Sequence, residues 1–189
     1  MNVYNLTGQI GSGKSLAQKI LEKLNIKCIC ADNIIKDLYR RPKIVEEVGR
    51  IIPKSVRKNM IDFDKIREII FTNQYKMEEL ENYIHPEVIK EFEILKNKYI
   101  NREILIQVIP VIKNNTIFKN YKNIYIESKK EIRIERIKKR SGYKDNLINK
   151  IIDYQNSIDR YKDNCDYIIF NNTTELNFEE EIKNIIKKL

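Results

Sequence analysis

The apolar positions of this 189-residue chain follow two different patterns. Short runs that are almost continuously apolar, with many β-branched residues, are typical of strands buried in a parallel sheet, and they lie at 2–7, 26–31, 103–109, 121–127 and 166–170. Between these runs, apolar residues recur every three or four positions, which indicates amphipathic helices. The alternation predicts an α/β fold, a three-layer sandwich in which a five-stranded parallel sheet has helices on both faces.

The longest helical region lies between the second and third predicted strands, where Pro42, Pro53 and Pro86 separate the helical patterns. We interpret Pro86 as part of the first turn of a helix that His85 begins. The length of the chain predicts one domain over 1–189, in which this insertion can cover a substrate. Within it we expect a helical substrate-binding subdomain at 33–100 and a lid region at 129–161. The other helices are expected at 13–25, 129–140, 144–161 and 179–189.

A glycine-rich loop joins the first strand to the first helix. It fits the pattern G-x-x-x-x-G-K-[ST] and holds three of the chain's five glycines. Glycine tolerates positive φ, so successive N–H groups can point at a phosphate beside a helix N-terminus. In this motif the lysine reaches the β- and γ-phosphates and the serine hydroxyl binds Mg²⁺. We therefore predict binding of a nucleotide's phosphates, with Ser15 as the metal ligand, through Gly8, Gln9, Ile10, Gly11, Ser12, Gly13, Lys14, Ser15 and Leu16.

Composition narrows the function only slightly. The formal net charge of +9 suits either a polyanionic partner or a chain that is simply rich in lysine. Cys28, Cys30 and Cys165, with no signal peptide before them, predict reduced thiols in the cytoplasm. A single histidine and one unpaired Cys-x-Cys give no basis for a zinc site. No apolar run approaches the roughly 20 residues that span a bilayer. We expect no membrane or nucleic-acid partner, and a monomer or weak homo-oligomer.

Charged side chains at two places suggest phosphoryl transfer. Asp32 follows the second strand, at the carboxyl edge of the sheet where ligands bind. Its carboxylate can accept a proton from a substrate hydroxyl, or it can cap the next helix, and the two roles are compatible. Arg133, Arg136 and Arg140 recur on one helical face. They either stabilise the charge of a transferred phosphoryl group from a lid or form a solvated basic face.

Other positions also leave two interpretations open. His85 is either a substrate contact or a structural residue. Asn171 and Asn172 follow the last strand and either line an adenine pocket or form a plain turn. The third strand ends at Pro110 without the aspartate that often supports Mg²⁺ there. The metal would therefore depend on Ser15, water and the nucleotide, with Asp32 as a further candidate.

Several segments, in the same order, resemble those of the dephospho-CoA kinase family, the last enzymes of coenzyme A synthesis. The resemblance extends over essentially the whole chain. It departs from the family at Gln9, where the family has glycine, at Cys30, where it has aspartate, and at Lys113, where it has glutamate. The similar segments are Leu6 to Ser15, Cys30-Ala31-Asp32, Ile66 to Phe71, Ile84-His85-Pro86, Val108 to Ile112, Arg136 with Arg140, and Asp166 to Asn172.

The resemblance implies a P-loop NTPase fold that uses ATP and Mg²⁺ to phosphorylate the ribose 3′-hydroxyl of dephospho-CoA, giving coenzyme A and ADP. It implies catalytic roles for Asp32 as general base and for Lys14 and Arg140 at the phosphates. It further assigns Arg136, Asn171 and Asn172 to the nucleotide and Thr7, Asp32, Arg67, His85 and Pro110 to the acceptor.

Two alternatives stay open beside this one. The first is another small P-loop kinase that phosphorylates a nucleotide or a small alcohol. The second belongs to a different class, a P-loop nucleotide switch or a nucleic-acid-binding ATPase. The chain has no N-K-x-D stretch for reading guanine, which weighs against a GTP switch.

Overall fold

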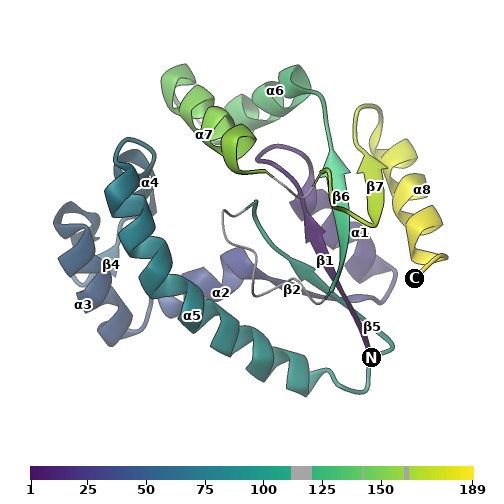
Figure 1. The fold of residues 1–189 in the computed structure, drawn as a ribbon, viewed down its shortest axis with the longest axis horizontal. Coiled ribbons are helices and arrows are strands. Elements are labelled where there is room, and N and C mark those ends of the chain that lie inside the picture. The colour runs from purple at the N-terminus through teal and green to yellow at the C-terminus, as the bar shows by residue number, and fades with distance from the viewer. Residues whose placement is uncertain (112–120, 142, 160–161) are drawn as a thin grey trace. The chain divides into compact units, whose positions relative to one another are not determined.

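The computed structural model describes residues 1–111, 121–141, 143–159 and 162–189 (Figure 1). Lys113 lies outside the described residues. The chain divides into two compact units, the first made of Met1–Cys30 with Lys98–Leu189 and the second of Ala31–Asn97. Of the helices that are described, none is long and apolar enough to cross a membrane.

The first unit is built on a five-stranded parallel sheet with the strand order β2-β5-β1-β6-β7. This confirms the predicted parallel α/β sheet. Because β1 is central, the loop that follows it lies at the middle of the carboxyl edge, where parallel sheets bind ligands. The strands are β1 Asn2–Thr7, β2 Lys27–Cys30, β5 Ile104–Val108, β6 Lys122–Glu127 and β7 Tyr167–Phe170.

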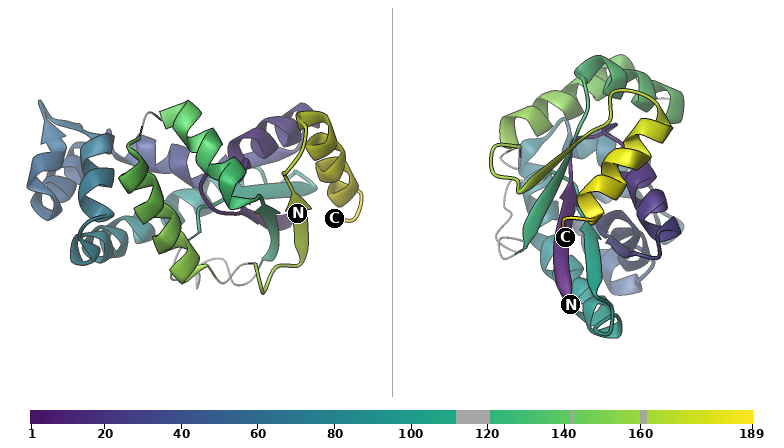
Figure 2. Two further views of the ribbon diagram at one scale, coloured as in Figure 1. Left: turned by 90° about the horizontal axis from the view of Figure 1, so that it is seen from above. Right: turned by 90° about the vertical axis from the view of Figure 1, so that its right-hand side faces the viewer.

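Two helices of the first unit, α1 and α8, lie side by side against one face of the sheet (Figure 2). Their buried side chains, Ile20 of α1 and Phe178 of α8 among them, join Leu6 and Ile124 of the strands in one hydrophobic core. The helices α6 and α7 share a smaller apolar cluster of their own. The bounds are α1 Lys14–Lys23, α6 Lys130–Ser141, α7 Asp145–Ile158 and α8 Glu175–Ile186.

The predicted start of the last helix, at residue 179, was wrong. Helix α8 begins at Glu175 because Thr174 caps it, its hydroxyl accepting a hydrogen bond from the backbone N–H of Asn177 at 3.3 Å. A threonine N-cap followed by an acidic first residue is a common helix start, and it places the true boundary four residues earlier.

The second unit is helical apart from one short hairpin. Lys58 and Asn59, with φ of 48° and 60°, form the turn of this hairpin, a conformation that asparagine tolerates better than most residues. Without an Asn-Gly pair, the sequence did not predict it. The elements are α2 Ala31–Leu38, α3 Pro42–Ile51, the 3-10 turn Pro53–Ser55, β3 Val56–Arg57, β4 Met60–Ile61, α4 Phe63–Ile70 and α5 Gln74–Lys98.

The helix α5 corrects a second prediction. His85 does not begin a helix, because α5 runs unbroken from Gln74 to Lys98 with Pro86 inside it. A proline inside a helix costs about 3 kcal/mol, since it removes one N–H donor and crowds the preceding turn. Ile84, Val88 and Phe92 are all buried on either side of the proline. Each such side chain contributes about 1.5–3 kcal/mol on burial, enough to offset that cost.

Candidate active site

The phosphate loop, residues 8–15, connects β1 to α1 and has the backbone of an anion-binding loop. Gly11 and Gly13 have φ of 79° and 113°, values that side chains disfavour. A Cβ on Gly13 would also overlap the side-chain amide of Asn171, so only glycine fits there. The loop leads into the first turn of α1, whose N–H groups have no acceptor within the helix. These groups are therefore available for phosphate oxygens.

Lys14 lies against the loop that precedes it. Its ammonium donates hydrogen bonds to the carbonyl oxygens of Gly8 at 2.5 Å and Gln9 at 3.3 Å. The buried hydroxyls of Thr7, at the end of β1, and of Ser12, in the loop, have no hydrogen-bond partner among the residues that the structure describes. The side chain of Ser15 is exposed at the first turn of α1. Together, a cation, a hydroxyl and unpaired N–H donors suit a nucleotide polyphosphate with its Mg²⁺.

Arg136 of α6 braces the loop from outside. Its guanidinium donates to the hydroxyl of Ser128 at 3.2 Å, and at 3.5 Å to the carbonyls of Gly11 and Ser12. It also donates to the side-chain oxygen of Asn171 at 3.0 Å. Partial burial lowers the pKa of Arg136, although arginine keeps its charge in proteins. The structure thus brings Arg136, Asn171 and the loop together, and their contacts with a nucleotide stay predictions.

Asn172, the next residue, forms a hydrogen bond that connects β7 to α6. Its side-chain oxygen accepts a hydrogen bond from the backbone N–H of Lys129 at 2.8 Å, just before α6 begins. Asn172 therefore fixes the start of α6 relative to the end of β7. A contact with adenine stays a prediction.

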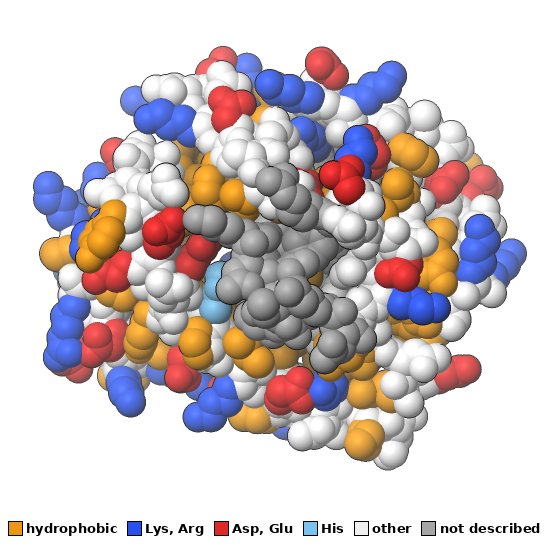
Figure 3. Space-filling model, in the orientation of Figure 1, with side chains coloured by type: hydrophobic (Ala, Val, Ile, Leu, Met, Phe, Trp, Pro, Cys, Tyr) orange, Lys and Arg blue, Asp and Glu red, His pale blue; other side chains and the backbone are white. Residues whose placement is uncertain are grey.

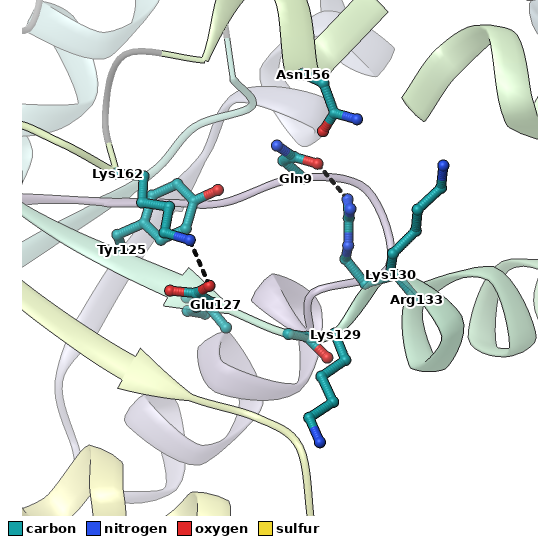
Figure 4. Close-up of a pocket in the computed structure, with 10 residues that line it drawn as sticks. Gln9, Tyr125, Glu127, Lys129, Lys130, Arg133, Asn156 and Lys162 are labelled. Atoms are coloured by element: carbon teal, nitrogen blue, oxygen red, sulfur yellow. Dashed lines mark hydrogen bonds and ion pairs between the residues drawn. The ribbon is translucent and has the colours of Figure 1, made fainter. Parts of the chain in front are cut away.

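Arg133 was missed as a contact of the loop. It is only 6 % exposed, and it donates a hydrogen bond to the side-chain oxygen of Gln9 (Figure 4). Burial lowers the pKa of this guanidinium. The sequence placed Arg133 with the other arginines on one face, yet Ile137, one turn later, is also buried. That i, i+4 pairing of arginine with isoleucine was the signal that Arg133 points inward.

The amide nitrogen of Gln9 contacts a carboxylate. This nitrogen donates to Asp159 at 3.1 Å, and the hydroxyl of Tyr125 donates to the same carboxylate oxygen at 2.6 Å. Burial and this hydrogen bond to Asp159 raise the pKa of Tyr125, which keeps its proton at any physiological pH. We call Gln9, Tyr125, Arg133 and Asp159 the Gln9 network.

A pocket of about 230 Å³ lies beside this network. At one side Lys162 forms an ion pair with Glu127 at 2.6 Å, which raises the pKa of the lysine, so the two charges balance (Figure 4). Figure 4 shows the side chains of Lys129 and Lys130 extending away from Gln9. The pocket is lined by Gln9, Tyr125, Ile126, Glu127, Ser128, Lys129, Lys130, Arg133, Asn156 and Lys162.

Three predicted site residues belong to the second unit. Asp32 is exposed in the first turn of α2, two residues after β2 ends, and thus lies inside the helix instead of capping it. Arg67 forms an ion pair with Asp64 on α4 at 3.2 Å. His85 is half-buried inside α5, and burial lowers its pKa, so it is neutral at pH 7. Their contacts with substrate stay predictions.

The remaining predicted residues lie in the first unit. Arg140 is exposed on α6, one helical turn after Arg136, and is therefore accessible to a ligand. Pro110 lies two residues after the buried end of β5 and is half-buried.

A phosphate loop that joins the central strand of a parallel sheet to the helix that follows it is the defining feature of the P-loop kinase fold. The chain belongs to the dephospho-CoA kinase family, whose model matches residues 2–177. It is 32 % identical to the dephospho-CoA kinase of Fusobacterium nucleatum over 97 % of this chain and 94 % of that one. The dephospho-CoA kinase of Rickettsia typhi is 29 % identical over 100 % and 98 % of the two chains.

Solved structures agree with this assignment. A dephospho-CoA kinase from Campylobacter jejuni is similar over 99 % of this chain and 96 % of its own, with 26 % identity and a TM-score of 0.62. A shikimate kinase from Acinetobacter baumannii, 16 % identical over 100 % of this chain and 94 % of its own, shares the fold with a TM-score of 0.51. The predicted family, kinase class and place in coenzyme A biosynthesis are thereby confirmed.

The charge distribution adds little support for the nucleic-acid alternative. On the face drawn in Figure 3, Lys and Arg side chains are interspersed with Asp and Glu. A nucleic-acid site usually gathers its basic side chains into one patch or stripe. Among the described residues on this face, the excess of positive charge therefore forms no single basic surface.

Proposed function

We propose that this protein transfers the γ-phosphoryl group of ATP to the ribose 3′-hydroxyl of dephospho-CoA, giving coenzyme A and ADP. The observation that carries the proposal is the phosphate loop, whose positive-φ glycines and enclosed Lys14 suit a nucleotide polyphosphate, in a chain that matches this family from residue 2 to 177. We expect it to act in the cytoplasm as a monomer or weak homo-oligomer.

The loop residues hold the nucleotide in this proposal. Backbone N–H groups at the start of α1 bind phosphate oxygens, and Lys14 exchanges its loop carbonyls for the β- and γ-phosphates. Arg140, exposed on α6, contacts the transferred group and stabilises its charge. Arg136 and Asn171 hold the loop in shape, and Asn172 borders the adenine.

Mg²⁺ fits the donors that are present. The exposed hydroxyl of Ser15 lies in the first turn of α1, where the motif places its metal ligand. Among the described residues, no cluster of three or more His, Cys, Asp or Glu side chains could hold a metal ion. Mg²⁺ keeps several waters in such sites and is held by one or two protein groups together with substrate phosphates, so it needs no dedicated cluster of protein ligands. When bound, the ion neutralises phosphate charge.

The acceptor is activated by Asp32 in this proposal. Its exposed carboxylate can be reached by a ribose hydroxyl, from which it takes a proton as the hydroxyl oxygen attacks phosphorus. Thr7, Arg67, His85 and Pro110 are the proposed contacts for the remainder of dephospho-CoA. The second unit would then bind the acceptor, with 129–161 acting as the lid.

The test is ADP release with ATP and Mg²⁺, measured alone, with dephospho-CoA, and with a panel of nucleoside monophosphates. We expect stimulation by dephospho-CoA alone and a product that carries a new 3′-phosphate by mass and NMR. Stimulation by a monophosphate instead would keep the kinase and overturn the acceptor. No stimulation by any acceptor would overturn the proposed activity.

A further inference from the structure

We propose that Gln9 is a positioning residue that couples the phosphate loop to α6 and to the end of α7. The inference concerns a side chain at a position where the family has glycine, as noted above. Its catalytic consequences rest on the proposed function, whereas its effect on nucleotide binding can be measured without any acceptor.

The chemistry of its neighbours fixes the orientation of the Gln9 amide. A guanidinium can only donate hydrogen bonds and a carboxylate can only accept them. The amide oxygen must therefore face Arg133 and the amide nitrogen must face Asp159, as the structure has them. The oxygen and the nitrogen of one neutral amide are both hydrogen-bonded, and Gln9 bridges a buried cation and a carboxylate.

The adjacent loop residue strengthens the same connection. The backbone N–H of Ile10 donates to the side-chain oxygen of Gln155 on α7 at 2.7 Å. Gly11 packs so closely on α6 that a Cβ there would lie 2.7 Å from the carbonyl oxygen of Arg133. Three consecutive loop residues thus contact α6, α7 or the residue that follows α7. The Gln9 side chain supplies the hydrogen bonds to charged groups in this contact.

Because Arg133 is buried, loss of its hydrogen bond to Gln9 should have a large effect. Removing a guanidinium from water is costly unless acceptors replace the water. The Nε of Arg133 has no partner within the described part of the chain, so the bond to Gln9 matters more. Loss of that bond would let α6 shift to find solvent or another acceptor. Because Arg136 and Arg140 lie on α6, such a shift would move both relative to the bound phosphates.

The decisive test exchanges hydrogen-bonding partners. Gln9→Glu keeps an oxygen for Arg133 but turns an acceptor toward the Asp159 carboxylate. Asp159→Asn alone still offers an oxygen to both Gln9 and Tyr125. In the double variant, the amide introduced at position 159 donates one hydrogen bond to the carboxylate introduced at position 9. Its second N–H donates to the hydroxyl oxygen of Tyr125, which then accepts where it had donated. The pairing with position 9 is thereby restored in reverse.

We expect Gln9→Glu to lower kcat and the affinity for ADP, each by roughly tenfold, the usual scale of coupling between contacting groups. Asp159→Asn should stay within about threefold of wild type, and the double variant should recover to about the same level.

A matched control is available on α1. Gln18 donates its amide to Glu22 at 2.9 Å at the surface, so Gln18→Glu creates the same facing carboxylates in solvent. Its kinetics and pH profile should equal those of wild type, since exposed like-charge pairs cost little.

The measurements are kcat and KM for ATP from pH 6 to 9, calorimetric ADP affinity, and thermal melting. Gln9→Glu equal to wild type at every pH, or a double variant no better than Gln9→Glu, would overturn the proposal.

Should Gln9→Glu not fold, Gln9→Gly removes the side chain without adding charge. A severalfold loss of ADP affinity in that variant would support the coupling, and wild-type affinity would overturn it. If wild type fails to phosphorylate dephospho-CoA, the proposed function falls, and the ADP affinities still decide the role of Gln9.

Discussion

Arg136 and Asn171, which are 35 residues apart in the sequence, form one brace around the phosphate loop. The guanidinium donates to the side-chain oxygen of Asn171 at 3.0 Å, and the amide of Asn171 donates to the backbone carbonyl of Ser12 at 2.7 Å. Asn171 is only 2 % exposed; its bond to Ser12 is buried and its bond to Arg136 is partly buried. The brace connects α6, the end of β7 and the nucleotide loop.

Asn171→Ala should destabilise the protein and loosen the loop together. It leaves a buried carbonyl and part of a guanidinium without their partner, a loss of about 1–3 kcal/mol. We expect a lower melting temperature and a raised KM for ATP, measured by thermal melting and steady-state kinetics. Asn184→Ala, at an exposed position on α8, is the matched control and should change neither. An unchanged KM for ATP in Asn171→Ala would show that the brace serves stability alone.

The sheet and the loop could be predicted from the sequence because their signals are local. Apolar runs gave the five strands, and the spacing from Gly8 to Ser15 gave the loop. The continuity of α5 through Pro86 depends instead on tertiary burial, which a local helix-breaking rule does not include. The same holds for Arg133, whose neighbours Gln9 and Asp159 are more than twenty residues away in the sequence.

Lys14→Ala should impair both nucleotide binding and turnover. The ammonium that lies on the loop carbonyls is the proposed contact of the β- and γ-phosphates. Loss of one preorganised charge of this kind typically costs a hundredfold or more in rate, or about 2.7–4 kcal/mol. The measurements are calorimetric ADP affinity and ADP release. Lys19→Ala, exposed on the same helix, should retain both. Normal kinetics in Lys14→Ala would contradict the assignment of the loop.

Asp32→Asn separates catalysis from binding. The amide keeps the size of the side chain but cannot take a proton from the ribose hydroxyl. We expect turnover to fall by about a hundredfold or more, the usual contribution of a general base, while ADP affinity is retained. Asp37→Asn, on the same helix and in an exposed ion pair with Arg40, is the matched control. Equal turnover in the two variants would mean that Asp32 serves only as an acidic residue that stabilises the first turn of α2.

His85 should make stability depend on pH in the weakly acidic range. Burial lowers its pKa in the folded protein below the ordinary value of 6.5, so the unfolded chain binds the proton more readily. The free energy of unfolding should therefore decrease as the pH falls from about 7 through 6.5 toward the lower pKa of the folded state. His85→Asn, which is neutral throughout, should lack this component. Urea unfolding of both proteins at pH 7.5, 6.5 and 5.5 measures the difference directly, because the carboxylates common to both cancel. Parallel stability profiles for the two proteins would show that His85 titrates alike in the folded and unfolded states.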